Sequence, residues 1–118
     1  MADPRTTDRL GHILAAITAI GDYTAGKTFI DFQSDRLLID AVERNIERLS
    51  EASRLLADEM KAGYPDIPWR EIAGIGSVLR HAYDRVAPER IWQIVNDDLV
   101  LLGQAVEAMI DALEKDSE

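Results

Sequence analysis

Apolar residues recur every three or four positions along the whole chain, which is the period of an α-helix, and no strand alternation or internal repeat is present. The pattern predicts four helices, over residues 6–24, 34–62, 69–83 and 88–113. Short connections between helices favour antiparallel neighbours. The expected fold is therefore an all-α, antiparallel bundle of four to five helices that forms one domain over residues 1–118.

Glycine and proline mark where the predicted helices begin and end. Gly26 ends the first helix, residues 28–33 look like a connector, and Ser34 suits the N-cap of the second helix. Pro65 follows the end of that helix, and Pro68 fits the first turn of the third. The breaks are few, so most of the chain is expected to be helical.

The predicted helices differ in the width of their apolar stripes. The first carries on one side Leu10, Leu14, Ile17, Gly21 and Thr24. The second has a heptad-like seam of Leu38, Val42, Asn45, Leu49, Ala52 and Leu56. The fourth has Trp92, Val95, Leu99, Leu102, Val106, Met109 and Leu113, widened by Ile91, Leu101 and Ala105. So broad a stripe must touch more than one neighbour, and the excess apolar surface favours a homodimer.

Composition narrows the class of protein. The 118 residues are 47% hydrophobic, which supports a packed core, and they include no cysteine, so disulfides and thiolate metal ligands are excluded. No apolar run has the length of a signal peptide or a membrane helix, and we expect a cytoplasmic protein without membrane contact. The net charge of −9 argues against a general nucleic-acid coat protein, although residues 70–90 are net positive.

The third predicted helix carries the candidate chemistry. Its inward side is expected to hold Trp69, Ile72, Gly76 and Leu79. An adjacent stripe contains Ser77, Arg80, His81 and Asp84, because residues spaced three, four and seven apart share a helix face. Glycine is costly inside a helix, so Gly74 and Gly76 indicate that a facing helix or a ligand comes close.

A histidine beside an arginine can cleave RNA without a metal ion. The imidazole of His81 can move a proton near neutral pH, and the guanidinium of Arg80 can stabilise charge that develops on a phosphate. The 2′-hydroxyl of RNA then supplies the nucleophile. An Arg–His pair on a helix is more often a solvated or ion-paired surface feature, and Tyr83 is more often a half-buried ring than a modification site.

A few polar residues lie outside the third helix. Asn45 falls in the apolar seam of the second helix, where a buried amide needs a hydrogen-bond partner. Asp31 and Asp35 suit helix capping better than metal binding. His12 has no companion residues in the sequence, and no role is assigned to it.

Three segments together resemble the HepT-like family of the HEPN superfamily. They read Tyr64-Pro-Asp-Ile-Pro-Trp-Arg-Glu-Ile-Ala-Gly74, Leu79-Arg-His-Ala-Tyr83 and Ile91-Trp92, with Val42-Glu-Arg-Asn-Ile-Glu-Arg-Leu-Ser-Glu-Ala52 upstream. The resemblance implies a helical homodimer that acts as the toxin of a type VII toxin–antitoxin pair. Such toxins are endoribonucleases without metal or cofactor, and their active site forms across the dimer. The partner is a minimal nucleotidyltransferase antitoxin.

The family resemblance also implies residue roles. His81 matches the catalytic histidine, and Tyr83 matches the tyrosine to which the antitoxin transfers AMP from ATP. The family motif has an arginine four to six residues before the histidine, whereas position 76 here is glycine. Arg80 resembles the arginine of a variant branch, and Arg44 or an arginine across the dimer are alternatives.

The sequence therefore favours an RNA endonuclease toxin in which His81 is the general acid and base and Arg80 stabilises the phosphate. Ser77 and Asp84 would orient these groups, and Tyr83 would accept AMP. The alternative is a non-catalytic module that only docks to, or is modified by, the nucleotidyltransferase. A purely structural helical dimer is a third possibility.

Overall fold

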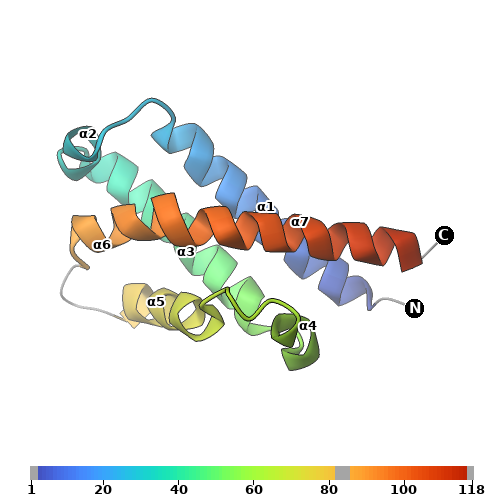
Figure 1. Cartoon of the computed structure of the whole chain (residues 1–118). Coiled ribbons are helices and arrows are strands. Elements are labelled where there is room, and N and C mark those ends of the chain that lie inside the picture. The colour runs from blue at the N-terminus through green and yellow to red at the C-terminus, as the bar shows by residue number, and fades with distance from the viewer. Residues whose placement is uncertain (1–2, 82–85, 117–118) are drawn as a thin grey trace.

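The protein is built from helices of very different lengths (Figure 1). A computed structural model describes residues 3–81 and 86–116. The helices are α1 (Pro4–Thr24), α2 (Phe29–Gln33), α3 (Arg36–Arg54), α4 (Asp58–Ala62), α5 (Trp69–His81), α6 (Pro88–Gln93) and α7 (Leu99–Asp116), with a π-helical turn, Ile94–Asp98, between the last two. The described residues contain no strand, and the predicted all-α bundle is confirmed.

Side-chain caps fix where the helices begin. The Asp3 carboxylate accepts a hydrogen bond from the backbone N–H of Arg5, with Pro4 at the first helical position of α1. Asp35 caps α3 by accepting from the N–H of Leu38 at 3.1 Å. The N-cap of this helix is thus Asp35, and the prediction of Ser34 was wrong by one residue.

The predicted connector at residues 28–33 contains a helix of its own. Thr28 and Asp31 form a reciprocal capping box at the start of α2, each side chain bonding to the other's backbone N–H. The helix is fixed to the bundle by its aromatic rings, because the Phe32 ring centroid lies 5.0 Å from that of Trp92. The segment thus connects α1 to α3 as predicted, but it contains a short helix that was not predicted, and the capping role of Asp31 and Asp35 is confirmed.

The second predicted helix, 34–62, is interrupted. α3 ends at Arg54, and Ala57 is extended at φ −63° and ψ 141° before α4 begins. The Arg9 guanidinium of α1 donates to the free carbonyl oxygen of Leu55 at 2.9 Å, which satisfies one of the acceptors left at the helix end. The break turns the chain while Leu56 stays buried in the core.

α3 lies at the centre of the bundle, between α1 and α5, and α1 also packs against α7 (Figure 1). The whole predicted seam of α3 is buried. The amide nitrogen of Asn45 within this seam donates to the Ala41 carbonyl at 2.9 Å, so the buried amide has its partner. The largest fully buried apolar side chains are Leu10, Ile13, Ile20, Phe32, Val42, Ile46, Leu49, Ile91, Ile94, Leu102 and Val106.

The apolar face of α1 is only partly the predicted one. Its buried residues are Leu10, Ile13, Ala16 and Ile20, whereas Leu14 and Ile17 are half-buried and Gly21 is exposed. Ile17 faces α7, because a Cβ built on Gly103 would lie 3.8 Å from its side chain. α1 therefore packs through two faces. The sequence pattern identified mainly the less buried of the two, which carries Leu14 and Ile17.

The last predicted helix is not α-helical along its whole length. Its bonds switch to the wider π pattern at Ile94–Asp98, and α7 continues to Asp116. The predicted stripe is buried at Leu99, Leu102, Val106 and Met109, but Leu101 is 44% exposed. None of the helices in the described residues combines the length and apolar character needed to cross a membrane.

Candidate active site

The helix that carries the candidate chemistry, α5, is anchored at its first residue. The indole N–H of Trp69 is shared between the carbonyl oxygens of Lys61 and Tyr64, each 3.1 Å away. These bonds tie the start of α5 to the end of α4 and the loop between them. Ile72 and Gly76 are buried on the inward side, as predicted, and α5 packs against α3.

Gly76 is where α5 meets α3. A Cβ built on Gly76 would lie 2.3 Å from the Cβ of Ser50 and 2.9 Å from its hydroxyl oxygen, far inside normal contact distance. Ser50 is only 1% exposed. By contrast, nothing lies within 4 Å of a Cβ at Gly74. The close approach expected from the glycines is therefore a helix–helix contact at Gly76 alone.

This packing explains the departure from the family motif. The position five residues before His81 faces α3 and has no space for any side chain. An arginine at position 76 would separate α3 from α5. Position 76 therefore cannot hold the arginine of the usual motif in this packing.

The outer stripe of α5 is exposed at Ser77, Arg80 and His81. Asp84 and Tyr83, the other two predicted site residues, lie outside the described residues. Arg80 forms an ion pair with Glu51 of α3, its guanidinium nitrogen 3.7 Å from the carboxylate oxygen. The sequence placed these α5 residues on one face correctly, but it could not show that the face adjoins α3.

Glu51 has a second and closer partner. Two guanidinium nitrogens of Arg54 donate to its carboxylate at 3.1 and 2.7 Å. The Arg54 hydrogen bond, with weaker attraction from Arg80, holds the pKa of Glu51 below its ordinary value. Because Arg54 also holds Glu51, this carboxylate does not depend on Arg80 for its ion pair.

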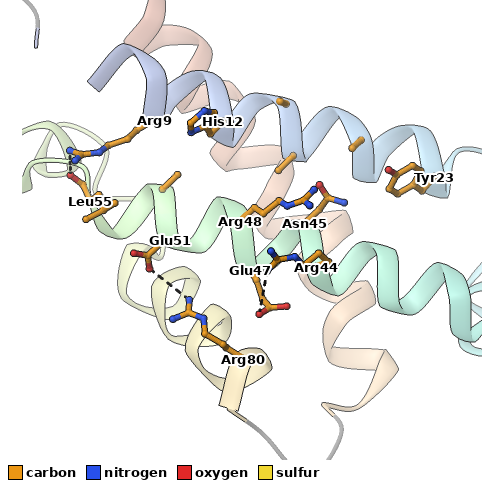
Figure 2. Close-up of a pocket in the computed structure, with 14 residues that line it drawn as sticks. Arg9, His12, Tyr23, Arg44, Asn45, Glu47, Arg48, Glu51, Leu55 and Arg80 are labelled. Carbon is orange, nitrogen blue, oxygen red and sulfur yellow. Dashed lines mark hydrogen bonds and ion pairs between the residues drawn. The ribbon is translucent and has the colours of Figure 1, made fainter. Parts of the chain in front are cut away.

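Arg80 also lines a groove of about 840 Å³ that runs between α1 and α3, here called the α1–α3 groove (Figure 2). Helix α1 contributes Arg9, His12, Ala15, Ala16, Ala19 and Tyr23, α3 contributes Arg44, Asn45, Glu47, Arg48, Glu51 and Ala52, and Leu55 closes one end. His81 follows Arg80 directly in the chain but is not among the lining residues. The candidate site thus lies at the edge of a groove that contains four arginines.

Several basic residues of the α1–α3 groove were not identified from the sequence. Arg44, one alternative source of positive charge, does line it, and its ion pair with Glu47 is long at 4.0 Å. Arg9, His12 and Arg48 were missed because they come from two helices whose relative rotation no sequence pattern reveals. The available signals were local: the spacing of four between Arg44 and Arg48, and of three between Arg9 and His12. Among the described residues, no three His, Cys, Asp or Glu side chains gather as metal ligands would.

Comparisons with known proteins show to which family the chain belongs. The sequence profile described as "Ribonuclease HepT-like" matches residues 13–111, and the chain belongs to this family. It is 36% identical over 106 residues to a gamma-glutamylcyclotransferase and putative RNase of Methanocaldococcus jannaschii, covering 90% of this chain but 48% of that protein. It is 37% identical over 102 residues to a probable ribonuclease HepT of Thermococcus cleftensis, covering 86% and 93% of the two chains.

A putative RNase of Caldanaerobacter subterraneus subsp. tengcongensis is 31% identical over 101 residues, or 86% of this chain and 90% of that one. The chain thus spans about half of the first of these relatives and nearly all of the other two. No solved structure matches the chain significantly.

Proposed function

We propose that the chain is an RNA endonuclease in which His81 moves the proton and Arg80 stabilises the phosphate. The observation that carries the proposal is the exposure of both side chains on the last turn of α5, with Arg80 opening onto a groove lined by further arginines. The family membership and the names of the relatives support the same reaction class.

The proposed reaction needs no group beyond these side chains and the RNA. The imidazole of His81 takes the proton of the 2′-hydroxyl as its oxygen attacks the adjacent phosphorus. The bond from phosphorus to the 5′-oxygen breaks, and the protonated His81 gives its proton to that oxygen, leaving a 2′,3′-cyclic phosphate. Arg80 stabilises the added negative charge on the phosphate oxygens, and Ser77 and Asp84 orient the two groups.

We further propose that the chain works as a homodimer and is the toxin of a pair whose antitoxin is a minimal nucleotidyltransferase. The antitoxin transfers AMP from ATP to the phenol oxygen of Tyr83 and releases pyrophosphate. An AMP group two residues from His81 would fill the site and repel the phosphates of RNA. This part of the proposal rests on the family resemblance of the segment that ends in Tyr83.

The test is cleavage of single-stranded RNA by the purified protein in excess chelator. Wild-type protein is expected to yield 2′,3′-cyclic phosphate ends, and His81→Ala is expected to abolish them. Lys115→Gln on α7 removes an exposed positive charge away from the site and serves as control. Equal cleavage by wild-type and His81→Ala protein would exclude the assigned role.

A second candidate function is a non-catalytic module that the nucleotidyltransferase binds or modifies. The tight packing of Gly76 on Ser50 favours it, because this packing excludes the arginine of the usual motif. The expected result is then no RNA cleavage, together with an ATP-dependent gain of one AMP mass that Tyr83→Phe prevents. Neither activity would point to a purely structural helical dimer.

A further inference from the structure

The α1–α3 groove is positive in a protein that is otherwise strongly negative. Its lining contains four arginines and two glutamates, a formal charge of +2, so the remaining residues carry −11 of the total −9. An anionic chain is attracted to this groove and repelled by most of the other surface. The charge distribution therefore favours the α1–α3 groove as the place where a polyanion binds.

Among the described residues, no basic side chain of the groove has a carboxylate closer than 3.7 Å. Arg48 and His12 are exposed, and within the described part of the chain neither has a carboxylate at ion-pair distance. Arg9 is held by the Leu55 carbonyl, which is neutral. Among residues 3–81 and 86–116, Arg44 and Arg80 pair only with glutamates, at the long distances given above. The positive charges of the four arginines are thus available to phosphates.

The shape of the groove suits an extended single strand. Ala15, Ala16 and Ala19 leave space along α1, and Tyr23 stands near one end with 45% of its surface exposed (Figure 2). From Arg9 to Tyr23 the helix rises about 21 Å, at about 1.5 Å per residue. An exposed phenol ring offers a face on which an unpaired base can stack, which a base inside a duplex cannot do.

We propose that the α1–α3 groove holds the single-stranded RNA that flanks the cleavage point. Arg44, Arg48 and His12 bind backbone phosphates, Tyr23 stacks on a base, and Arg80 joins the groove to the reacting phosphate beside His81. This inference rests on the proposed RNA endonuclease activity, but it concerns binding and is testable apart from cleavage.

The experiment measures binding of a fluorescently labelled single-stranded RNA of 12 nucleotides by anisotropy, as a function of salt. His81→Ala protein is used so that the RNA stays intact. Adding Arg48→Gln is expected to lower the slope of log affinity against log salt by about 0.7, one phosphate contact, which is about a fivefold loss at 0.1 M salt. Lys115→Gln, which removes one positive charge outside the groove, is expected to leave both quantities unchanged.

Tyr23→Ala separates stacking from charge. It is expected to weaken binding at least fivefold while leaving the salt slope unchanged, because a base contact releases no counterions. In the cleaving protein, both substitutions should raise KM for a long RNA and leave kcat largely intact, since neither side chain touches the reacting phosphate.

The outcomes distinguish this inference from the proposed function. If RNA binds through Arg48 and Tyr23 but the wild-type protein never cleaves it, the groove is an RNA-binding site and the proposed endonuclease activity is wrong. Normal cleavage with unaltered affinity in both variants would refute the groove alone. Unaltered RNA affinity, with Arg48→Gln changing the oligomeric state in light scattering, would assign the groove to contact between copies of the chain and overturn the inference.

Discussion

Replacing Gly76 with alanine tests the helix contact on which the candidate site depends. The added methyl group would lie 2.3 Å from the Cβ of Ser50, which is buried. The substitution gains about 1 kcal/mol of helix propensity. Forcing a methyl group into a packed contact costs about 1–3 kcal/mol. Gly76→Ala is therefore expected to be neutral to destabilising.

Gly74→Ala is the matched control, two residues away on the same helix. The propensity gain is the same, but nothing lies within 4 Å of the new Cβ, so this variant should be stabilised by about 1 kcal/mol. The stability of the two variants should then differ by the packing cost, about 1–3 kcal/mol, or about 4–12 °C in Tm for a chain of this size.

Thermal unfolding followed by circular dichroism measures this difference directly. Cleavage by the same samples shows whether the shift of α5 also displaces Arg80 and His81, in which case kcat falls for Gly76→Ala but not for Gly74→Ala. Tm values within about 2 °C of each other would show that α5 does not pack on Ser50 as described.

Three further substitutions test other features of the bundle. Ser50→Ala removes a buried hydroxyl that has no hydrogen-bond partner among the described residues, and urea unfolding should show a gain of about 1 kcal/mol; a loss would reveal a partner for it. Burial, aided by Glu71, raises the pKa of Asp98, so the folded state disfavours its charge. Asp98→Asn should therefore raise Tm at neutral pH, with the gain disappearing on acidification below the ordinary aspartate pKa; a gain independent of pH would exclude this cause. The Arg54 hydrogen bond lowers the pKa of Glu51, so its stabilisation is complete above the ordinary glutamate pKa and is lost as pH falls through the lowered value. Glu51→Gln should be less stable than wild type near neutral pH, and the two should converge at low pH; a constant difference would contradict the assignment.

The longer helices could be predicted because their apolar pattern repeats over several turns. The seam of α3 repeats over five helical turns and is buried throughout, and the inward face of α5 was placed correctly at Ile72 and Gly76. α2 has only five residues, too few for the apolar period to register. Its signal was Thr28 followed three residues later by Asp31, a capping pair rather than a periodicity.

The candidate site was only half predictable for a different reason. Arg80 and His81 are neighbours on one helix, and their common exposure follows from helical geometry. The α1–α3 groove depends on how α1 is rotated against α3, and this rotation differs from the one that Leu14 and Ile17 suggested. The π turn at Ile94–Asp98 was equally hidden, because one displaced hydrogen-bond register leaves no signature in residue type.

The chain's two tryptophans occupy different junctions, which makes intrinsic fluorescence a selective reporter. Trp92 packs against Phe32 of the short helix α2 with the two rings tilted by 34°, whereas the Trp69 indole is hydrogen-bonded where α4 meets α5. In a Trp69→Phe protein the remaining emission follows detachment of α2, and in a Trp92→Phe protein it follows release of the corner that holds the candidate catalytic helix. Stopped-flow mixing of each single-tryptophan protein with RNA would time the movement of one junction without interference from the other.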